Sequence, residues 1–172
     1  MNSYNDFCKN ILNIRNYNML DKIKQIVGEE KKTLFNKTND LAGYCKYIAS
    51  LIENRLKDIN IRTYWLDLND LIEVDHVILI AEYKYNNEVR RVLIDHTYQQ
   101  FVKRENARLL KFKTWPSEKL DKRILEELLQ NGLIELNDSI FNNYLSSFGK
   151  QIDINLDEFL LFYQTENIIK RK

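Results

Sequence analysis

Residues 76–95 read HVILIAEYKYNNEVRRVLID, and this stretch decides the fold. It holds two runs rich in β-branched and apolar residues, His76–Tyr83 and Val89–Ile94, on either side of the pair Asn86-Asn87. An asparagine pair between two such runs predicts a tight β-hairpin, because asparagine tolerates the left-handed backbone that a two-residue turn requires. The first run is apolar on both faces at its start, so we expect it to be a central strand.

The segments on either side of the hairpin predict helices and one further strand. Apolar residues recur at helical spacing from Cys45 to Leu56, and residues 61–68 have the composition of a strand. Helical patterns also occur at 21–27, 118–131, 139–148 and 156–169. The first three of these stretches are followed by Gly28, Gly132 and Gly149, and we expect each glycine to end its helix. We therefore predict an α+β fold with N-terminal helices, a small antiparallel sheet and C-terminal helices packed on it.

Length and composition predict one ordinary globular domain. A chain of 172 residues with 44% hydrophobic and 30% charged residues can bury one core, and we expect a single domain over residues 1–172. Its core is expected at 39–101, followed by a C-terminal helical elaboration at 112–172. The net charge of +1 does not favour nucleic acid or an anionic membrane as a partner.

No run approaches the roughly 18 apolar residues that span a bilayer, and residues 1–19 lack the apolar core of a signal peptide. We therefore expect a cytoplasmic protein, although export without a signal, as an effector or toxin, would leave no mark in the sequence. The oligomeric state stays open.

The hairpin register places a histidine beside an acid. If Tyr85 and Glu88 flank a two-residue turn, Ile78 lies opposite Asp95, and side chains alternate between the faces of each strand. His76 then shares a face with Asp95 as its diagonal neighbour, at about 7–8 Å between backbones. A carboxylate at this place fixes the tautomer of the imidazole and stabilises the imidazolium.

Cys45 is the candidate nucleophile. It starts a predicted helix, where exposed N–H groups and the helix dipole favour a thiolate. Gly43, two residues earlier, leaves room for a substrate near the backbone, and the amide of Cys45 is a candidate oxyanion donor. We therefore predict a catalytic trio in which Cys45 attacks an acyl carbon, His76 moves the proton and Asp95 orients the histidine.

This order of Cys45, His76 and Asp95, with the cysteine opening a helix after Gly-x, resembles the papain-like and transglutaminase-like cysteine enzymes. The segment Leu93–Thr97 looks like the Asp-Pro-Thr ending of the transglutaminase-like core, with histidine where proline is common, and no aromatic residue follows His76. The match covers roughly residues 39–101.

The resemblance implies acyl transfer through a thioester on a peptide or protein substrate: peptide hydrolysis, glutamine deamidation or transamidation. It also suggests Asn39 as a side-chain donor of an oxyanion hole, where glutamine is usual. No cofactor or metal is expected in this chemistry. We expect the helices after Lys111 to shape the substrate cleft.

Each of these residues also has a structural interpretation. Cys45 could be a buried structural thiol, His76 a core histidine with satisfied hydrogen bonds, and Asn39 a helix cap. For Cys8 the structural interpretation is preferred, since nothing near it in the sequence would activate the thiol. His96 is also interpreted as structural, with a hydrogen bond to a loop carbonyl.

Two further alternatives stay open at this level. A zinc site could combine Cys45 and His76 with Asp95 or His96, although these residues lack a recognised ligand spacing. The chain could also be a non-catalytic interaction module that retains the fold. The basic residues between Lys111 and Arg123 are interpreted as a solvated face, because acidic neighbours offset them.

Overall fold

The computed structural model describes residues 19–33, 43–103 and 114–170, and its fold is α+β as the sequence predicts. A helix spans residues 19–33. The later elements, in chain order, are α2 (Cys45–Asp58), β1 (Arg62–Asp67), α3 (Asn69–Ile72), β2 (Val77–Tyr85), β3 (Glu88–Ile94), the 3-10 helix η1 (Tyr98–Phe101), α4 (Pro116–Lys119), α5 (Lys122–Asn131), β4 (Leu133–Glu135), α6 (Asp138–Ser146) and α7 (Leu156–Lys170).

The hairpin has the predicted register. Tyr85 pairs with Glu88, and the pairing continues inward to Leu79 opposite Ile94. Asn86 has φ 50° and the next residue, also asparagine, has φ 63°. Positive φ at both central residues is the geometry of a turn that matches the twist of the two strands, which is why an asparagine pair fits here.

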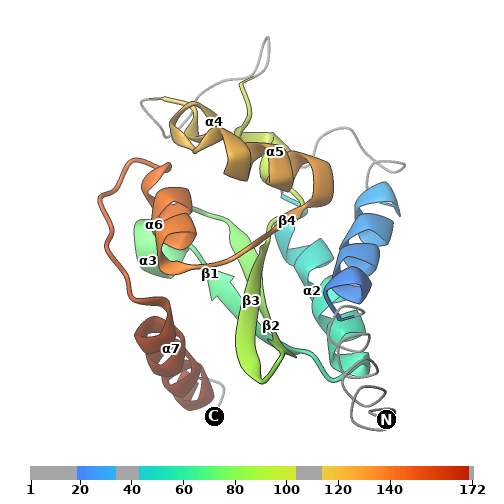
Figure 1. Cartoon of the computed structure of the whole chain (residues 1–172). Helices are drawn as coiled ribbons and strands as arrows, with labels where there is room; N and C mark the ends of the chain where they lie inside the picture. The colour runs from blue at the N-terminus through green and yellow to red at the C-terminus, as the bar shows by residue number, and fades with distance from the viewer. Residues whose placement is uncertain (1–18, 34–42, 104–113, 171–172) are drawn as a thin grey trace, which may run out of the picture.

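The sheet has four antiparallel strands in the order β1-β2-β3-β4, so β2 is an inner strand as predicted. Alternate residues of β2 enter two different cores. Ile78 packs with α5, α6 and α7 on one face, whereas Leu79 packs with α2 and the helix at 19–33 on the other. Figure 1 shows these helices on the two sides of the strands.

β4 is an element that the sequence did not predict, because it falls between two helix-like stretches of the part expected to be a helical elaboration. Its three residues pair with the end of β3, and Leu133 and Ile134 enter opposite cores. A strand this short shows too little alternation to be recognised from the sequence. The preceding Gly132 ends α5 with φ +73°, as predicted. The prediction for Gly28 is wrong, because the helix at 19–33 continues through it.

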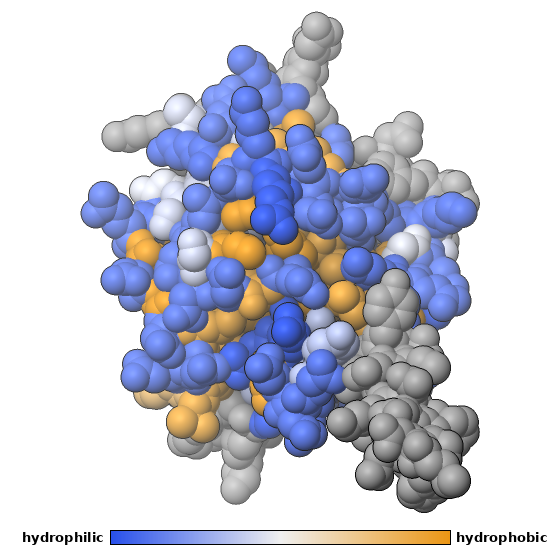
Figure 2. All heavy atoms as spheres, viewed as in Figure 1, coloured by the Kyte–Doolittle hydropathy of each residue, from blue (hydrophilic) through white to orange (hydrophobic). Residues whose placement is uncertain are grey.

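Polar and charged residues cover most of the face seen in Figure 1, and apolar residues come to the surface in its middle (Figure 2). Within the described ranges, no helix combines the length and the apolar content that crossing a bilayer would need.

Gly132 offers a test of how tightly β4 packs beside the hairpin. A Cβ at this position would lie 2.8 Å from His96 Cβ and 3.2 Å from His96 Cα, and the backbone has φ +73°. We expect Gly132→Ala to lower the free energy of unfolding by roughly 2–4 kcal/mol, the sum of a left-handed backbone penalty and overpacking. Urea denaturation measures this change.

The control is Gly149→Ala, where φ is +102° but a Cβ would meet nothing within 4 Å. It should lower the stability by only about 1–2 kcal/mol. Equal losses for the two variants would contradict close packing of Gly132 against His96.

Candidate active site

Cys45 is the first residue of α2, and the chain enters the helix through Gly43 at φ +83°. The side chain of Cys45 is 7% exposed and belongs to the core on the α2 face of the sheet. The ring of His76 and the backbone N–H of Val77 lie close enough to its thiol to lower the pKa of that thiol. The structure therefore brings Cys45 and His76 near each other.

His76 lies directly before β2 and is fully buried. Its backbone N–H donates to Val74 O at 2.8 Å, and its carbonyl accepts from Leu68 N at 2.8 Å, so the main chain is fixed on both sides. The ring packs edge-on against Phe101, with centroids 4.8 Å apart and planes at 87°. These contacts leave the imidazole a single orientation at the end of the sheet.

The hydrogen bond between His76 and Asp95 confirms the geometry deduced from the hairpin. The Nε2 and Oδ2 atoms are 2.9 Å apart, and both side chains are buried. Because Nε2 faces the acid, Nδ1 is the nitrogen left to face the Cys45 thiol. The imidazole is thus hydrogen-bonded to the carboxylate of Asp95 and has the thiol of Cys45 near it.

Asp95 follows β3 and has further donors. Its backbone N–H donates to Gly132 O at 2.9 Å, which attaches it to the start of β4. The Tyr144 hydroxyl donates to Oδ2 at 2.6 Å, and the Thr97 hydroxyl to Oδ1 at 3.4 Å. With the bond from His76, this buried carboxylate accepts three side-chain hydrogen bonds, as a buried charge requires.

Gln100, in η1, places its side-chain nitrogen next to Nδ1 of His76. Nε2 lies 3.4 Å from His76 Nδ1, 3.1 Å from Thr97 O and 3.3 Å from Thr97 Oγ1. A carbonyl oxygen can only accept, so the atom facing Thr97 O must be the NH₂ group rather than the oxygen. A half-buried amide donor therefore stands beside the nitrogen that faces the thiol.

The surroundings shift the pKa values of the thiol and the imidazole in opposite directions. Burial raises the pKa of Cys45, but the hydrogen bond and charge of His76, with the Val77 N–H, outweigh it, so the pKa is lowered. Burial alone would lower the pKa of His76, yet the charge and hydrogen bond of Asp95, helped by Cys45, raise it to about 9. Burial likewise raises the pKa of Asp95, but His76 and then Tyr144 bring it below its usual value.

His96 behaves in the opposite way, although it follows Asp95 directly. It is 5% exposed, and burial lowers its pKa to about 4, so the ring is neutral. Its Nε2 has no hydrogen-bond partner among the described residues, so this nitrogen does not make the expected bond to a loop carbonyl. The neighbouring Gly132 backbone is packed against its Cβ. The ring of His96 is not among the side chains that hydrogen-bond Asp95 in the described structure.

The structure does not support the zinc alternative, because Nε2 of His76 is hydrogen-bonded to Asp95. In the described part of the chain, no group of three or more His, Cys, Asp or Glu side chains is placed to hold a metal ion. Asn39, the predicted oxyanion donor, and Cys8 lie outside the described residues, as does Lys111 of the basic stretch.

The prediction that the helices after Lys111 shape the cleft is wrong for α5, α6 and α7. Their apolar residues join the core on the face opposite to the one that contains Cys45. The reason is the alternation along β2, which offers both faces of the sheet for packing. A groove of about 830 Å³ lies between α5, α6 and the edge of β3 and β4, and none of Cys45, His76 and Asp95 lines it.

Two site residues escaped the sequence reasoning. Tyr144 is 49 residues from Asp95 and sits in a helix whose apolar spacing marks it only as a core residue. Gln100 is a polar residue five positions after Asp95, just before the buried Phe101, and this was a weak signal of a special role. Neither position follows from the hairpin parity that located His76.

Comparison of the chain with protein-family models, with curated proteins and with solved structures finds no match. The chemistry of the site must therefore be inferred from its own geometry.

The two histidines give a direct test of these electrostatics, because the chain contains no others. We expect NMR of the ring Cε1–Hε1 groups to show one histidine titrating near pH 9 and one near pH 4. The raised pKa of His76 also means that its protonation stabilises the fold fully below about pH 6.5, the value for an unfolded histidine. This contribution is lost as the pH rises to about 9.

For His96 the sign is reversed: stability is lost as the pH falls from about 6.5 to about 4, because the unfolded chain takes up this proton first. The variant His96→Asn assigns the two signals. If either histidine of the folded protein titrated near pH 6.5, the burial and the contacts described for that ring would be contradicted.

Proposed function

We propose that the protein is a cysteine-dependent acyl hydrolase or acyltransferase that acts on amide bonds of peptides or proteins. The observation that carries the proposal is the buried His76–Asp95 hydrogen bond beside the thiol of Cys45, which opens α2. A lowered thiol pKa beside a histidine that keeps its proton to about pH 9 is the charge state of an activated cysteine.

The proposed reaction begins when the Cys45 thiolate attacks the carbonyl carbon of the substrate. A C–S bond forms, and the carbonyl π electrons move to the oxygen as an oxyanion. The oxyanion collapses, the C–N bond breaks, and the Nδ1–H of His76 gives its proton to the departing amine. A thioester on Cys45 remains, with a neutral His76 whose Nε2–H still donates to Asp95.

In the second half, water or an amine attacks the thioester. His76 Nδ1 accepts the proton of the attacking group, a new oxyanion forms, and its collapse expels the Cys45 thiolate. Water as acceptor gives peptide cleavage or glutamine deamidation, and an amine gives a crosslink. Mass spectrometry of a treated protein separates these products, since deamidation adds about one dalton and cleavage divides the chain.

Asp95 and Gln100 have supporting parts in this scheme. Asp95 fixes the tautomer of His76 by accepting from Nε2, and its negative charge stabilises the imidazolium. The NH₂ group of Gln100 and the backbone N–H of Cys45 at the start of α2 are the donors that we assign to the oxyanion. The papain-like or transglutaminase-like core is part of the same proposal, supported by the order Cys45, His76, Asp95 and by the paired β2 and β3.

The nucleophile can be tested without knowing the substrate. We expect iodoacetamide at pH 7 to label Cys45 far faster than Cys8, and we expect p-nitrophenyl acetate to give a burst of one equivalent per chain. His76→Asn should slow the labelling of Cys45 by roughly 10–100-fold, because the thiol loses the cation that lowers its pKa. Quantitative peptide mass spectrometry gives both labelling rates in one sample.

The matched controls are Cys45→Ser, which should abolish the burst, and Cys8→Ser, which should leave it intact. Equally slow labelling of both cysteines would reject the enzyme and favour the non-catalytic interaction module.

Gln100 can be separated from the nucleophile by comparing two reactions. Alkylation of a thiolate forms no oxyanion, whereas acylation by an ester does. We expect Gln100→Ala to slow acylation by p-nitrophenyl acetate by about 10²–10³-fold, the usual effect of removing one oxyanion donor. Alkylation by iodoacetamide should stay within about twofold of the unsubstituted protein. If both rates fall together, Gln100 supports the thiolate rather than the oxyanion.

A further inference from the structure

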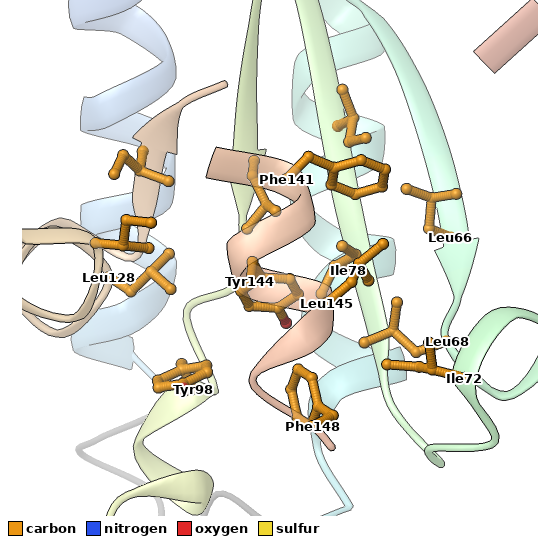
Figure 3. Packing of buried hydrophobic residues seen from close by; sticks show 14 of the residues in the cluster. Leu66, Leu68, Ile72, Ile78, Tyr98, Leu128, Phe141, Tyr144, Leu145 and Phe148 are labelled. Atoms are coloured by element: carbon orange, nitrogen blue, oxygen red, sulfur yellow. The ribbon is translucent and has the colours of Figure 1, made fainter. Parts of the chain in front are cut away.

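Oδ2 of Asp95 accepts two side-chain hydrogen bonds, from residues far apart in the sequence. One comes from His76 Nε2 at 2.9 Å and the other from the Tyr144 hydroxyl at 2.6 Å. Tyr144 belongs to α6 and is completely buried. Figure 3 shows its ring in the middle of the core on the α6 face, close to Tyr98 and Phe148.

The Tyr144 hydroxyl is a permanent donor. Burial, and after it the negative charge of Asp95, raise the pKa of Tyr144 well above its ordinary value. The hydroxyl therefore keeps its proton over the whole range in which His76 titrates. The backbone carbonyl of the same residue accepts from the Ser147 hydroxyl at 2.6 Å, which adds a polar contact to this turn of α6.

We propose that Tyr144 is a positioning residue that shares Asp95 Oδ2 with His76 and thereby makes it easier for His76 to release its proton. This inference rests on the proposed function, in which His76 must both keep a proton beside the thiolate and later release it to the leaving group. Tyr144 acts only through Asp95.

The physical reason is the change in charge that Oδ2 experiences during the reaction. While His76 is protonated, the imidazolium compensates the carboxylate, and the Tyr144 hydrogen bond adds little. Once His76 gives up its proton, the buried carboxylate loses that compensation, and a hydrogen bond to the more strongly charged oxygen becomes stronger. Tyr144 therefore stabilises the deprotonated state of His76 more than the protonated one.

The other titratable groups near Asp95 and Tyr144 do not obscure this effect on the pKa of His76. Asp95 faces His96 and Tyr144 faces Tyr98, whereas the Cys45 thiol faces His76. His96 is neutral above about pH 4, and burial keeps the pKa of Tyr98 above its usual value. Among the described groups facing the pair, Cys45 is thus the one whose charge must be followed along with His76.

The chain offers a matched control for Tyr144→Phe. Tyr98 is a second buried tyrosine in the same core, with its ring centroid 6.0 Å from that of Tyr144. Its hydroxyl makes no hydrogen bond to Asp95 in the described structure. Tyr98→Phe therefore removes a buried hydroxyl from the same cluster but leaves both donors to Asp95 Oδ2 in place.

The test is the NMR titration of His76 in the full chain and in both variants. We expect Tyr144→Phe to raise the pKa of His76 by about 0.5 to 1, and Tyr98→Phe to leave it unchanged. An unchanged or lowered pKa in Tyr144→Phe would overturn the proposal, because a tyrosine that only supports Asp95 structurally would weaken the Asp95–His76 bond when removed. This readout needs no substrate, so it succeeds or fails independently of the proposed reaction.

A measurement on the unsubstituted protein covers the case in which Tyr144→Phe does not fold. The hydroxyl proton of Tyr144 should move downfield in the NMR spectrum as His76 loses its proton, since its acceptor then becomes more strongly charged. A hydroxyl resonance that stays in place through the His76 titration would overturn the proposal.

Discussion

An imidazole with no exposed surface lies between a carboxylate and a thiol, and the arrangement around it depends on how those charges are compensated. An isolated charge in a protein interior is strongly destabilising, and a buried pair is tolerated only when its remaining donors and acceptors are satisfied. Here the carboxylate of Asp95 faces the ring of His76, whose pKa is raised. The carboxylate also accepts hydrogen bonds from the Tyr144 and Thr97 hydroxyls.

The end of the sheet is the place where such a group can form. Within β2 and β3, each side chain is committed to one face, so residues from the two cores are separated by the backbone. His76 and Asp95 lie just beyond the paired segments, where this separation ends. Cys45 reaches them from α2 on one face, and Tyr144 reaches them from α6 on the other. The site thereby connects the two cores at the end of the sheet.

The contrast between the two histidines shows that burial alone does not decide their charge. Both rings are within the interior, at 0% and 5% exposure, yet the pKa of His76 is raised to about 9 and that of His96 is lowered to about 4. Desolvation acts on both in the same direction. The hydrogen bond of His76 to Asp95, with the thiol on its other side, reverses the outcome for one ring only.

The sequence by itself determined the α+β class, the hairpin with its register, the helix that starts at Cys45, and the side of the strand on which His76 meets Asp95. These features follow from local rules, since the turn fixes the pairing and the alternation of side chains fixes the face. Only the tertiary structure decided that β4 joins the sheet, that α5, α6 and α7 cover the face away from Cys45, and that Tyr144 and Gln100 reach the site. Periodicity tells which side of a helix or strand is buried. It does not tell which face of the sheet a helix covers, because the apolar pattern of the helix is the same for either face.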